Sequence, residues 1–133
     1  MGDPYLAIQV VMMPRDTNPH GTIFGGVILS YLDQAGAIGG RREVALAGGP
    51  PPFLATVAMN RVEFLKPVLV GDVVKFWTRL VRMGRASITM HVQVEAERNQ
   101  EVLQVTAAEV VYVGVDLNAK ERPPKPLLPA KTP

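Results

Sequence analysis

Residues 85–97 read RASITMHVQVEAE, and in this stretch every even position is apolar and every odd position is polar. Side chains of a β-strand point alternately to its two faces, so the pattern predicts one long strand with a single buried face. Such a strand spans about 40 Å, roughly twice the usual length. The fold is therefore expected to contain an unusually long sheet.

Four further segments have strand-like patterns. Residues 72–82 alternate less strictly, and residues 53–65 and the shorter segment 4–13 also resemble strands. Residues 102–115 carry valines on both faces, which is typical of a central strand or of a strand covered by a partner.

Only one segment predicts a helix. From near Phe24 to Ile38, apolar residues recur at spacings of three and four and also occupy the other faces, so this helix is expected to be buried. Gly36, Gly39 and Gly40 predict that it ends there. The order of elements predicts an α+β domain with one antiparallel sheet wrapped around a buried helix. One helix leaves much of a long sheet uncovered, so at least a dimer is expected.

The composition limits the class of protein. The chain has 133 residues, 47% of them hydrophobic, and a formal net charge of +2, which fit a single globular domain. It has no cysteine, so disulfides, thiolate metal sites and a cysteine nucleophile are excluded. The N-terminus does not resemble a secretory signal, and no stretch is apolar and long enough to span a membrane. We therefore expect a cytoplasmic protein with neither a membrane nor a nucleic acid as partner.

Charge and proline are unevenly distributed. Residues 117–133 carry four basic residues against one acidic residue, and five of the twelve prolines, which predicts an extended tail outside a domain of residues 1–116. Within that domain, residues 60–90 hold six basic and two acidic residues. This cationic stretch either binds phosphates or forms the solvated faces of strands.

Asp33 is the only charged residue between Asp16 and Arg41, and it lies in the middle of the predicted helix. An unpaired carboxylate is costly to bury, so Asp33 is expected either to have a partner or to line a wet cavity. A structural role would pair it with Tyr31, an arginine or a backbone amide. The functional alternative is a general base or a nucleophile in a cleft.

The segment before the helix, residues 17–26, reads TNPHGTIFGG. Glycines let a substrate atom approach the backbone, and the first amides of a helix have no intrahelical acceptor, so the segment predicts an oxyanion hole. Alternatively, Gly25 and Gly26 only turn the chain or allow close packing. The segment is neither a P-loop nor a GxGxxG motif.

This segment, followed seven residues later by Asp33, resembles the hotdog-fold acyl-CoA thioesterases, and in particular the short single-domain bacterial acyl-CoA hydrolases. The likeness continues through residues 56–67 (TVAMNRVEFLKP), 70–72 (VGD), 84–88 (GRASI) and 122–123. The resemblance implies a long antiparallel sheet wrapped around one helix. It also implies a homodimer as the minimum active unit, often assembled into a hexamer as a trimer of dimers.

The resemblance also implies roles for individual residues. Asp33 would activate a water or attack the thioester carbonyl itself, while the Gly26 amide would polarise the carbonyl oxygen from the opposite subunit. Asn18 would orient substrate or water. Thr22 departs from the family, since many relatives have Asn or Asp there, so no catalytic role is transferred to it.

A coenzyme A site follows from the same resemblance, with coenzyme A as part of the substrate and with no separate cofactor or metal. Gly84, Arg85 and Ser87 resemble the family's nucleotide-contacting turn, and an arginine fork suits phosphate geometry. Lys66 and Arg122 are further candidates for contacts with the phosphates, Asn60 would line the pantetheine channel, and Gly25 is a further expected substrate contact. For Asn60 and Lys66, ordinary roles within or at the end of a strand are the alternative.

The predicted function is hydrolysis of an acyl-CoA to a carboxylic acid and coenzyme A. A non-catalytic acyl-CoA binding or sensing domain is the alternative, although such a domain usually carries a DNA-binding element. A hotdog dehydratase would need a histidine and an acid in the site, and His20 is poorly placed for that. His20 is expected to be structural or solvent-facing and His91 to be solvated, and the two do not make a metal site.

Overall fold

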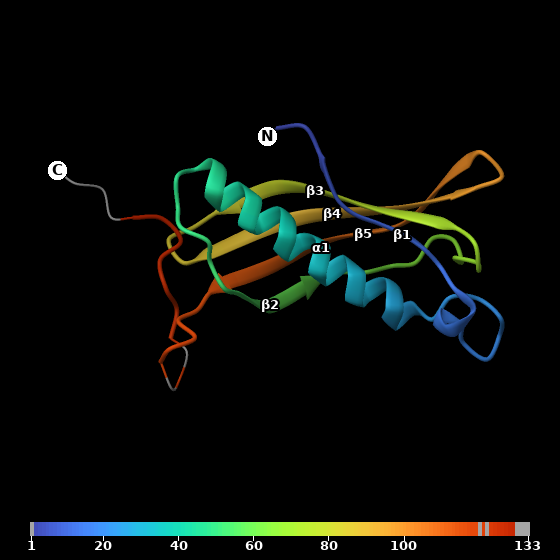
Figure 1. Ribbon diagram of the computed structural model, residues 1–133, viewed down its shortest axis with the longest axis horizontal. Coiled ribbons are helices and arrows are strands. Elements are labelled where there is room, and N and C mark those ends of the chain that lie inside the picture. Colours follow the sequence, from blue (N-terminus) through green and yellow to red (C-terminus); the bar gives the residue numbers. More distant parts are fainter. Residues whose placement is uncertain (1, 120, 122, 130–133) are drawn as a thin grey trace.

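The computed structural model describes residues 2–119, 121 and 123–129. Five strands form one antiparallel sheet in the spatial order β1-β3-β4-β5-β2, and one long helix lies across it (Figure 1). The elements in chain order are β1 (Tyr5–Val11), the short 3-10 helix η1 (Pro14–Asp16), α1 (Gly25–Leu46), β2 (Leu54–Asn60), β3 (Val73–Met83), β4 (Ser87–Arg98) and β5 (Glu101–Gly114). The expected α+β class, a long antiparallel sheet with one central helix, is confirmed.

The alternating stretch forms β4 at the centre of the sheet. Its apolar side chains, from Ile88 to Ala96, are buried in the core, while the polar ones between them are half-exposed. Asn99 and Gln100 both have positive φ values, 52° and 65°, and join β4 to β5 in a tight hairpin. β5 lies between β4 and β2, as its valine-rich sequence predicts for a central strand.

β2 is shorter than the sequence predicts. The expected strand extends through residue 65, but β2 ends at Asn60, and Arg61 follows with a φ of 50°. A left-handed residue interrupts the pleat, so residues 61–72 form a loop instead of a longer strand. This loop still runs beside β5, because the Leu65 N–H donates a hydrogen bond to the Val105 carbonyl at 2.8 Å.

Three glycines of α1 lie against the sheet and do not end the helix, which continues to Leu46. A Cβ at Gly36 would overlap the Tyr112 hydroxyl, and a Cβ at Gly39 would overlap the Thr78 side chain. The prediction of a helix end at these glycines is therefore wrong. They instead allow the helix backbone to approach β3 and β5 more closely than any other residue would permit.

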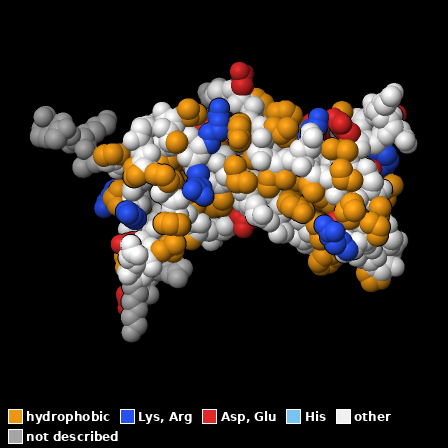
Figure 2. All heavy atoms as spheres, viewed as in Figure 1, with side chains coloured by type: hydrophobic (Ala, Val, Ile, Leu, Met, Phe, Trp, Pro, Cys, Tyr) orange, Lys and Arg blue, Asp and Glu red, His pale blue; other side chains and the backbone are white. Residues whose placement is uncertain are grey.

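α1 is buried on one face only. Ile28 and Leu32 lie in the core, whereas Phe24 is 57% exposed and Ile38 is also exposed. The expectation of a helix buried all round is thus not met within a single chain. Hydrophobic side chains are spread over the face of the molecule that carries α1, among few charged ones (Figure 2). A surface of this kind is typical of an interaction site.

The C-terminal segment packs on the domain. The Leu127 side chain is 1% exposed and belongs to the core, and its N–H donates a hydrogen bond to the Arg85 carbonyl at 3.0 Å. The Lys125 N–H donates to the Gly114 carbonyl at 2.7 Å. The prediction that the tail lies outside the core is therefore wrong at Leu127, which is buried in the core while Leu117 and Leu128 of the same tail are exposed. A boundary between residues 116 and 117 stays a proposal.

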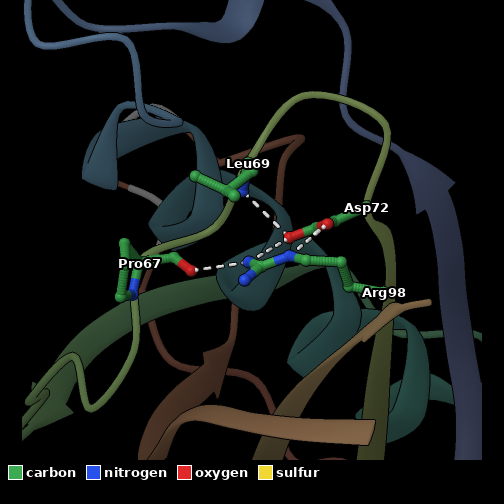
Figure 3. A network of polar contacts seen from close by, with 4 residues as sticks. All are labelled: Pro67, Leu69, Asp72 and Arg98. Atoms are coloured by element: carbon green, nitrogen blue, oxygen red, sulfur yellow. Dashed lines mark hydrogen bonds and ion pairs between the residues drawn. The ribbon is translucent and has the colours of Figure 1, made fainter. Parts of the chain in front are cut away.

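A buried ion pair lies at the end of the sheet that is opposite the C-terminal segment. Asp72, whose exposure is 2%, accepts hydrogen bonds from Arg98 and from the Leu69 N–H (Figure 3). Burial by itself would raise the pKa of Asp72, but the hydrogen bonds from Arg98 and Leu69 and the charge of Arg98 outweigh it. They hold the pKa below its ordinary value of 3.8.

This lowered pKa predicts a pH-dependent contribution to stability. The ion pair stabilises the fold fully above the ordinary pKa of 3.8, and the stabilisation is lost as the pH falls through the lower pKa of the folded state. We expect Asp72→Asn to lower the free energy of unfolding by about 2 kcal/mol at neutral pH, and the difference from wild type to shrink at acid pH. Urea titrations from pH 7 down to about pH 2 measure this, because the folded-state pKa lies below 3.8, and a pH-independent difference would contradict it.

Candidate active site

Asp33 lies in the middle of α1 and is half-buried. One carboxylate oxygen, Oδ1, accepts a hydrogen bond of 2.7 Å from the Thr56 hydroxyl in the edge strand β2. Among the described residues, the carboxylate forms no ion pair, and the Tyr112 hydroxyl lies close enough for the Asp33 carboxylate to help raise the tyrosine pKa. Within the described part of the chain, neither Tyr31 nor an arginine nor a backbone amide donates a hydrogen bond to it. Thr56 therefore holds one carboxylate oxygen, Oδ1, in place.

The backbone at Asp33 is fixed from the sheet. The buried Tyr112 hydroxyl of β5 donates a hydrogen bond of 2.6 Å to the Asp33 carbonyl, and Gly36 leaves room for the tyrosine ring. Burial, together with the nearby Asp33, raises the pKa of Tyr112, so the hydroxyl remains a donor. The carboxylate thus projects from a helical turn that is anchored to the core.

Thr56 and Tyr112 were not singled out as site residues by the sequence. Thr56 lies in the TVAMNRVEFLKP motif, and this motif is the only signal that pointed to it. Nothing local marks Tyr112, because its contact with Asp33 joins residues 79 positions apart.

We predict that Thr56→Val lowers kcat by about tenfold with a small change in KM, since the Asp33 carboxylate loses the donor that orients it. Thr56→Ser keeps the hydroxyl and is expected to retain most of the activity. Steady-state kinetics on an acyl-CoA measure both variants. Equal losses in the two would show that the hydroxyl is not the relevant group.

The start of α1 presents free amides. Among the described residues, the N–H groups of Gly25 and Gly26 have no acceptor, whereas the next amide, of Val27, donates to the Phe24 carbonyl at 3.0 Å. Phe24 precedes the helix without a side-chain cap, and its ring lies over Gly26, where a Cβ would come within 2.5 Å. Unpaired amides at a helix start can hold a developing negative charge.

Asn18 organises the loop before α1. Its amide Nδ2 donates to the Thr22 hydroxyl at 2.8 Å, and its carbonyl Oδ1 accepts from the backbone amides of His20 and Thr22 at 2.9 and 3.2 Å. The Thr22 hydroxyl therefore accepts a hydrogen bond from within the same loop. Within one chain, Asn18 shapes the approach to the helix start. Its predicted contact with substrate or water stays a prediction.

Asp33 and Gly26 share one face of α1 but are separated along it. Seven residues make nearly two turns, so the two positions face the same way and lie about 10 Å apart along the axis. A thioester carbonyl places its carbon and oxygen within about 3 Å of the groups that attack and polarise it. The axial separation of the two helix positions is larger than this reach.

A cavity of about 320 Å³ lies beside the helix start. Residues from the helix start line one side, and residues of the loop after β2 line the other; together they are Thr22, Ile23, Gly25, Ile28, Phe64, Leu65, Lys66, Pro67 and Val68. The structure thus brings the predicted contacts Gly25 and Lys66 together at one mostly apolar cavity. Asn60, at the exposed end of β2, does not line it.

The predicted nucleotide-contacting turn lies at the other end of the molecule. Gly84, Arg85 and Ser87 connect β3 to β4, beside the C-terminal segment, while the helix start lies at the opposite end of the sheet (Figure 1). The Gly84 N–H donates to the Ser87 carbonyl at 2.8 Å, and the Arg85 side chain is exposed. One chain therefore does not bring this turn and Lys66 together. Arg122 lies outside the described residues.

The histidines lie away from Asp33. His20 is exposed, as predicted, whereas His91 is half-buried on the sheet, where burial and the charge of Arg79 lower its pKa. The expectation of a fully solvated His91 is thus met only in part. No group of three or more His, Cys, Asp or Glu side chains within the described part of the chain is arranged to hold a metal ion. Over the same residues, no helix has both the length and the apolar character needed to cross a membrane.

A long antiparallel sheet with one glycine-rich helix across it, carrying a carboxylate and free first amides, defines a hotdog-fold domain. Comparisons with known proteins agree. Residues 20–103 match the model of the thioesterase superfamily. The chain belongs to this superfamily.

Its relatives include proteins named as acyl-CoA hydrolases. The chain is 37% identical over 123 residues to the acyl-CoA thioester hydrolase YciA of Salmonella typhimurium, covering 89% of this chain and 88% of the relative. It is similar to a hexameric thioesterase from Yersinia pestis, with 35% identity, a TM-score of 0.81 and coverage of 98% and 99% of the two chains. A hexameric hotdog fold thioesterase of Campylobacter jejuni has 37% identity, a TM-score of 0.75 and coverage of 91% and 88%.

Proposed function

We propose that the protein is an acyl-CoA thioester hydrolase that converts an acyl-CoA to a carboxylic acid and coenzyme A. The observation that carries the proposal is the Asp33 carboxylate, which Thr56 orients through one oxygen, on the same helix face as the Gly26 amide, which has no acceptor among the described residues. The names of its relatives point to the same reaction.

In this reaction a water adds to the thioester carbonyl carbon while Asp33 takes its proton. The carbonyl oxygen becomes negatively charged and is held by the Gly26 amide, which is worth about 3 kcal/mol of barrier in comparable sites. The carbon–sulfur bond then breaks, and the coenzyme A thiolate leaves and is protonated. Attack by the Asp33 carboxylate itself, through a mixed anhydride that water then cleaves, uses the same groups.

A complete site needs two subunits. Since Asp33 and Gly26 of one helix lie about 10 Å apart, Asp33 of one chain acts together with Gly26 of another in the proposed arrangement. Two helices that run antiparallel across a two-fold axis near Ser30 would place each Asp33 opposite a Gly26. The exposed Phe24, just before α1, and the 62% exposed Val57 on the edge strand β2 are the apolar surface that such a dimer would cover.

A dimer would also account for the position of the proposed coenzyme A contacts, which lie at opposite ends of the sheet within one chain. We propose that Lys66 and Gly25 belong to the acyl and thioester end of one site, while Gly84, Arg85 and Ser87 come from the other subunit and hold the nucleotide. Asn60 and Arg122 are further proposed contacts, and Asn18 is proposed to orient substrate or water. A hexamer built as a trimer of dimers, in which each dimer is active, is proposed from the assemblies named for the relatives.

The apolar cavity beside Gly25 is the proposed site for the acyl chain. Its volume within one chain is about 320 Å³, and in the proposed dimer the partner subunit would complete its walls. The reaction as proposed needs neither a metal nor a separate cofactor. That expectation and the cytoplasmic location remain predictions.

The test is release of free thiol from a panel running from acetyl-CoA to palmitoyl-CoA. Turnover of at least one acyl-CoA is expected, and the panel gives the chain-length profile. A folded protein that binds acyl-CoA but hydrolyses none would overturn the proposal and favour the non-catalytic binding domain. Hydration of an enoyl-CoA in place of thiol release would identify a dehydratase.

A further inference from the structure

One wall of the cavity comes from a loop without regular structure. Residues 61–72 connect β2 to β3, and residues 64–68, here called the cavity wall, face the start of α1 across the cavity. A segment outside helices and strands has many accessible conformations, so its position depends on a small number of contacts with its neighbours.

Arg98, the last residue of β4, binds this loop at two places (Figure 3). Its Nε and Nη2 donate to the two carboxylate oxygens of Asp72 at 2.9 and 2.7 Å, and Nη2 also donates to the Pro67 carbonyl at 3.1 Å. The Leu69 N–H completes the set with a hydrogen bond to Asp72 at 2.9 Å. Because Asp72 is buried, this ion pair is only weakly screened by salt.

The cavity wall is in turn bonded to the helix start. The carbonyl of Val68, next to Pro67, accepts a hydrogen bond of 2.8 Å from the Ile23 N–H. Both Val68 and Ile23 are buried and line the cavity, and Ile23 stands two residues before Gly25. Arg98, the cavity wall and the helix start therefore form one connected set of hydrogen bonds.

We infer that Arg98 is a positioning residue for acyl-CoA hydrolysis: through Asp72 and the Pro67 carbonyl it sets the spacing between the cavity wall and the helix start. That spacing determines which acyl chains fit. The inference rests on the proposed function. Arg98 acts only through the wall, so its effect falls on KM and on chain-length preference, and much less on kcat.

The chemistry of arginine allows this role to be separated from plain stabilisation. The planar guanidinium donates to Asp72 and to Pro67 at once, whereas the ammonium of lysine is a point charge on a flexible stem. Arg98→Lys therefore keeps a cation beside the buried Asp72 and releases the Pro67 carbonyl. The variant is expected to fold while its cavity wall is held less firmly.

The decisive measurement is the chain-length profile of Arg98→Lys. We expect KM for the best wild-type substrate to rise about fivefold, the preference to broaden toward longer chains, and kcat to stay within about twofold. Hydrogen exchange at the Ile23 amide is expected to be about tenfold faster. A wild-type chain-length profile in the folded variant would overturn the inference.

The ion pair of Lys75 with Glu97 provides a matched control. Its Nζ and Oε1 atoms lie 2.6 Å apart and join β3 to β4 without contacting the cavity wall. Arg98→Gln and Lys75→Gln remove the same charge from adjacent parts of the sheet. Only Arg98→Gln is expected to change the profile and the Ile23 exchange, so equal changes in both would point to general electrostatics and contradict the inference.

Failure of this inference and failure of the proposed function are distinguishable. If wild type releases thiol and Arg98→Lys has an unchanged profile, the proposed function stands and the inference falls. If wild type hydrolyses no acyl-CoA, exchange at the Ile23 amide still decides whether Arg98 holds the wall. Unchanged exchange in that case overturns the positioning role as well.

Discussion

Asp33→Asn is expected to lower kcat for the preferred acyl-CoA by about 10³-fold while leaving KM and the fold nearly unchanged. Asparagine has the shape of aspartate and can still accept the Thr56 hydrogen bond, but it can neither take a proton from water nor attack a carbonyl. Asp33 is the only charged side chain between Asp16 and Arg41, so this part of α1 carries no second carboxylate that could replace it.

Glu43→Gln is the matched control, because Glu43 is a second carboxylate on α1, near its C-terminal end and paired with Arg42. It is expected to keep nearly full activity. Single-turnover kinetics with both variants separate chemistry from product release, and circular dichroism checks the fold. A folded Asp33→Asn enzyme with wild-type kcat would remove Asp33 from the mechanism.

Mixing two inactive variants is expected to restore activity. Gly26→Pro removes the Gly26 N–H, and proline is tolerated in the first turn because that amide has no intrahelical acceptor. Loss of one oxyanion donor is expected to lower kcat by about 10²-fold or more. Gly26→Ala retains the N–H and only displaces the exposed Phe24 ring, so it serves as the control and is expected to lose far less.

Co-expressed Asp33→Asn and Gly26→Pro subunits pair at random, and half of the pairs are mixed. If each site combines Asp33 of one subunit with Gly26 of the other, a mixed pair has one intact site and one doubly defective site. The mixture is then expected to show about a quarter of wild-type activity, although each variant alone shows about one per cent or less. Activity equal to the average of the two variants would mean that each site lies within a single chain.

The long elements of the fold were predictable because their signals are local. The alternation in residues 85–97 depends only on the pleat of a strand, and it correctly predicted both β4 and its buried face. The helix start near Phe24 followed in the same way from periodicity. One error arose where a local signal has two interpretations. In the sequence, Gly36 and Gly39 resemble a helix end, but in the structure they allow the helix to pack closely against the sheet.

The candidate site was predictable in part. Asp33 stood out because a lone charge in an apolar helix is costly, and its position on α1 agrees with that expectation. Its orientation by Thr56 and Tyr112 was not predictable from composition or periodicity, since these contacts join residues 23 and 79 positions apart. Arg98 reaches Asp72 across 26 positions, and no pattern near either residue indicates the pair.

The sequence alone determined the α+β class, the faces of the long strands and the lone carboxylate of the helix, because each depends on side-chain periodicity or on the cost of burying a charge. Only the tertiary structure revealed that one face of α1 is exposed to solvent, that Leu127 is part of the core and that Arg98 is hydrogen-bonded to the cavity wall. These features depend on strand register and on the closure of loops, which bring together residues that no local pattern relates.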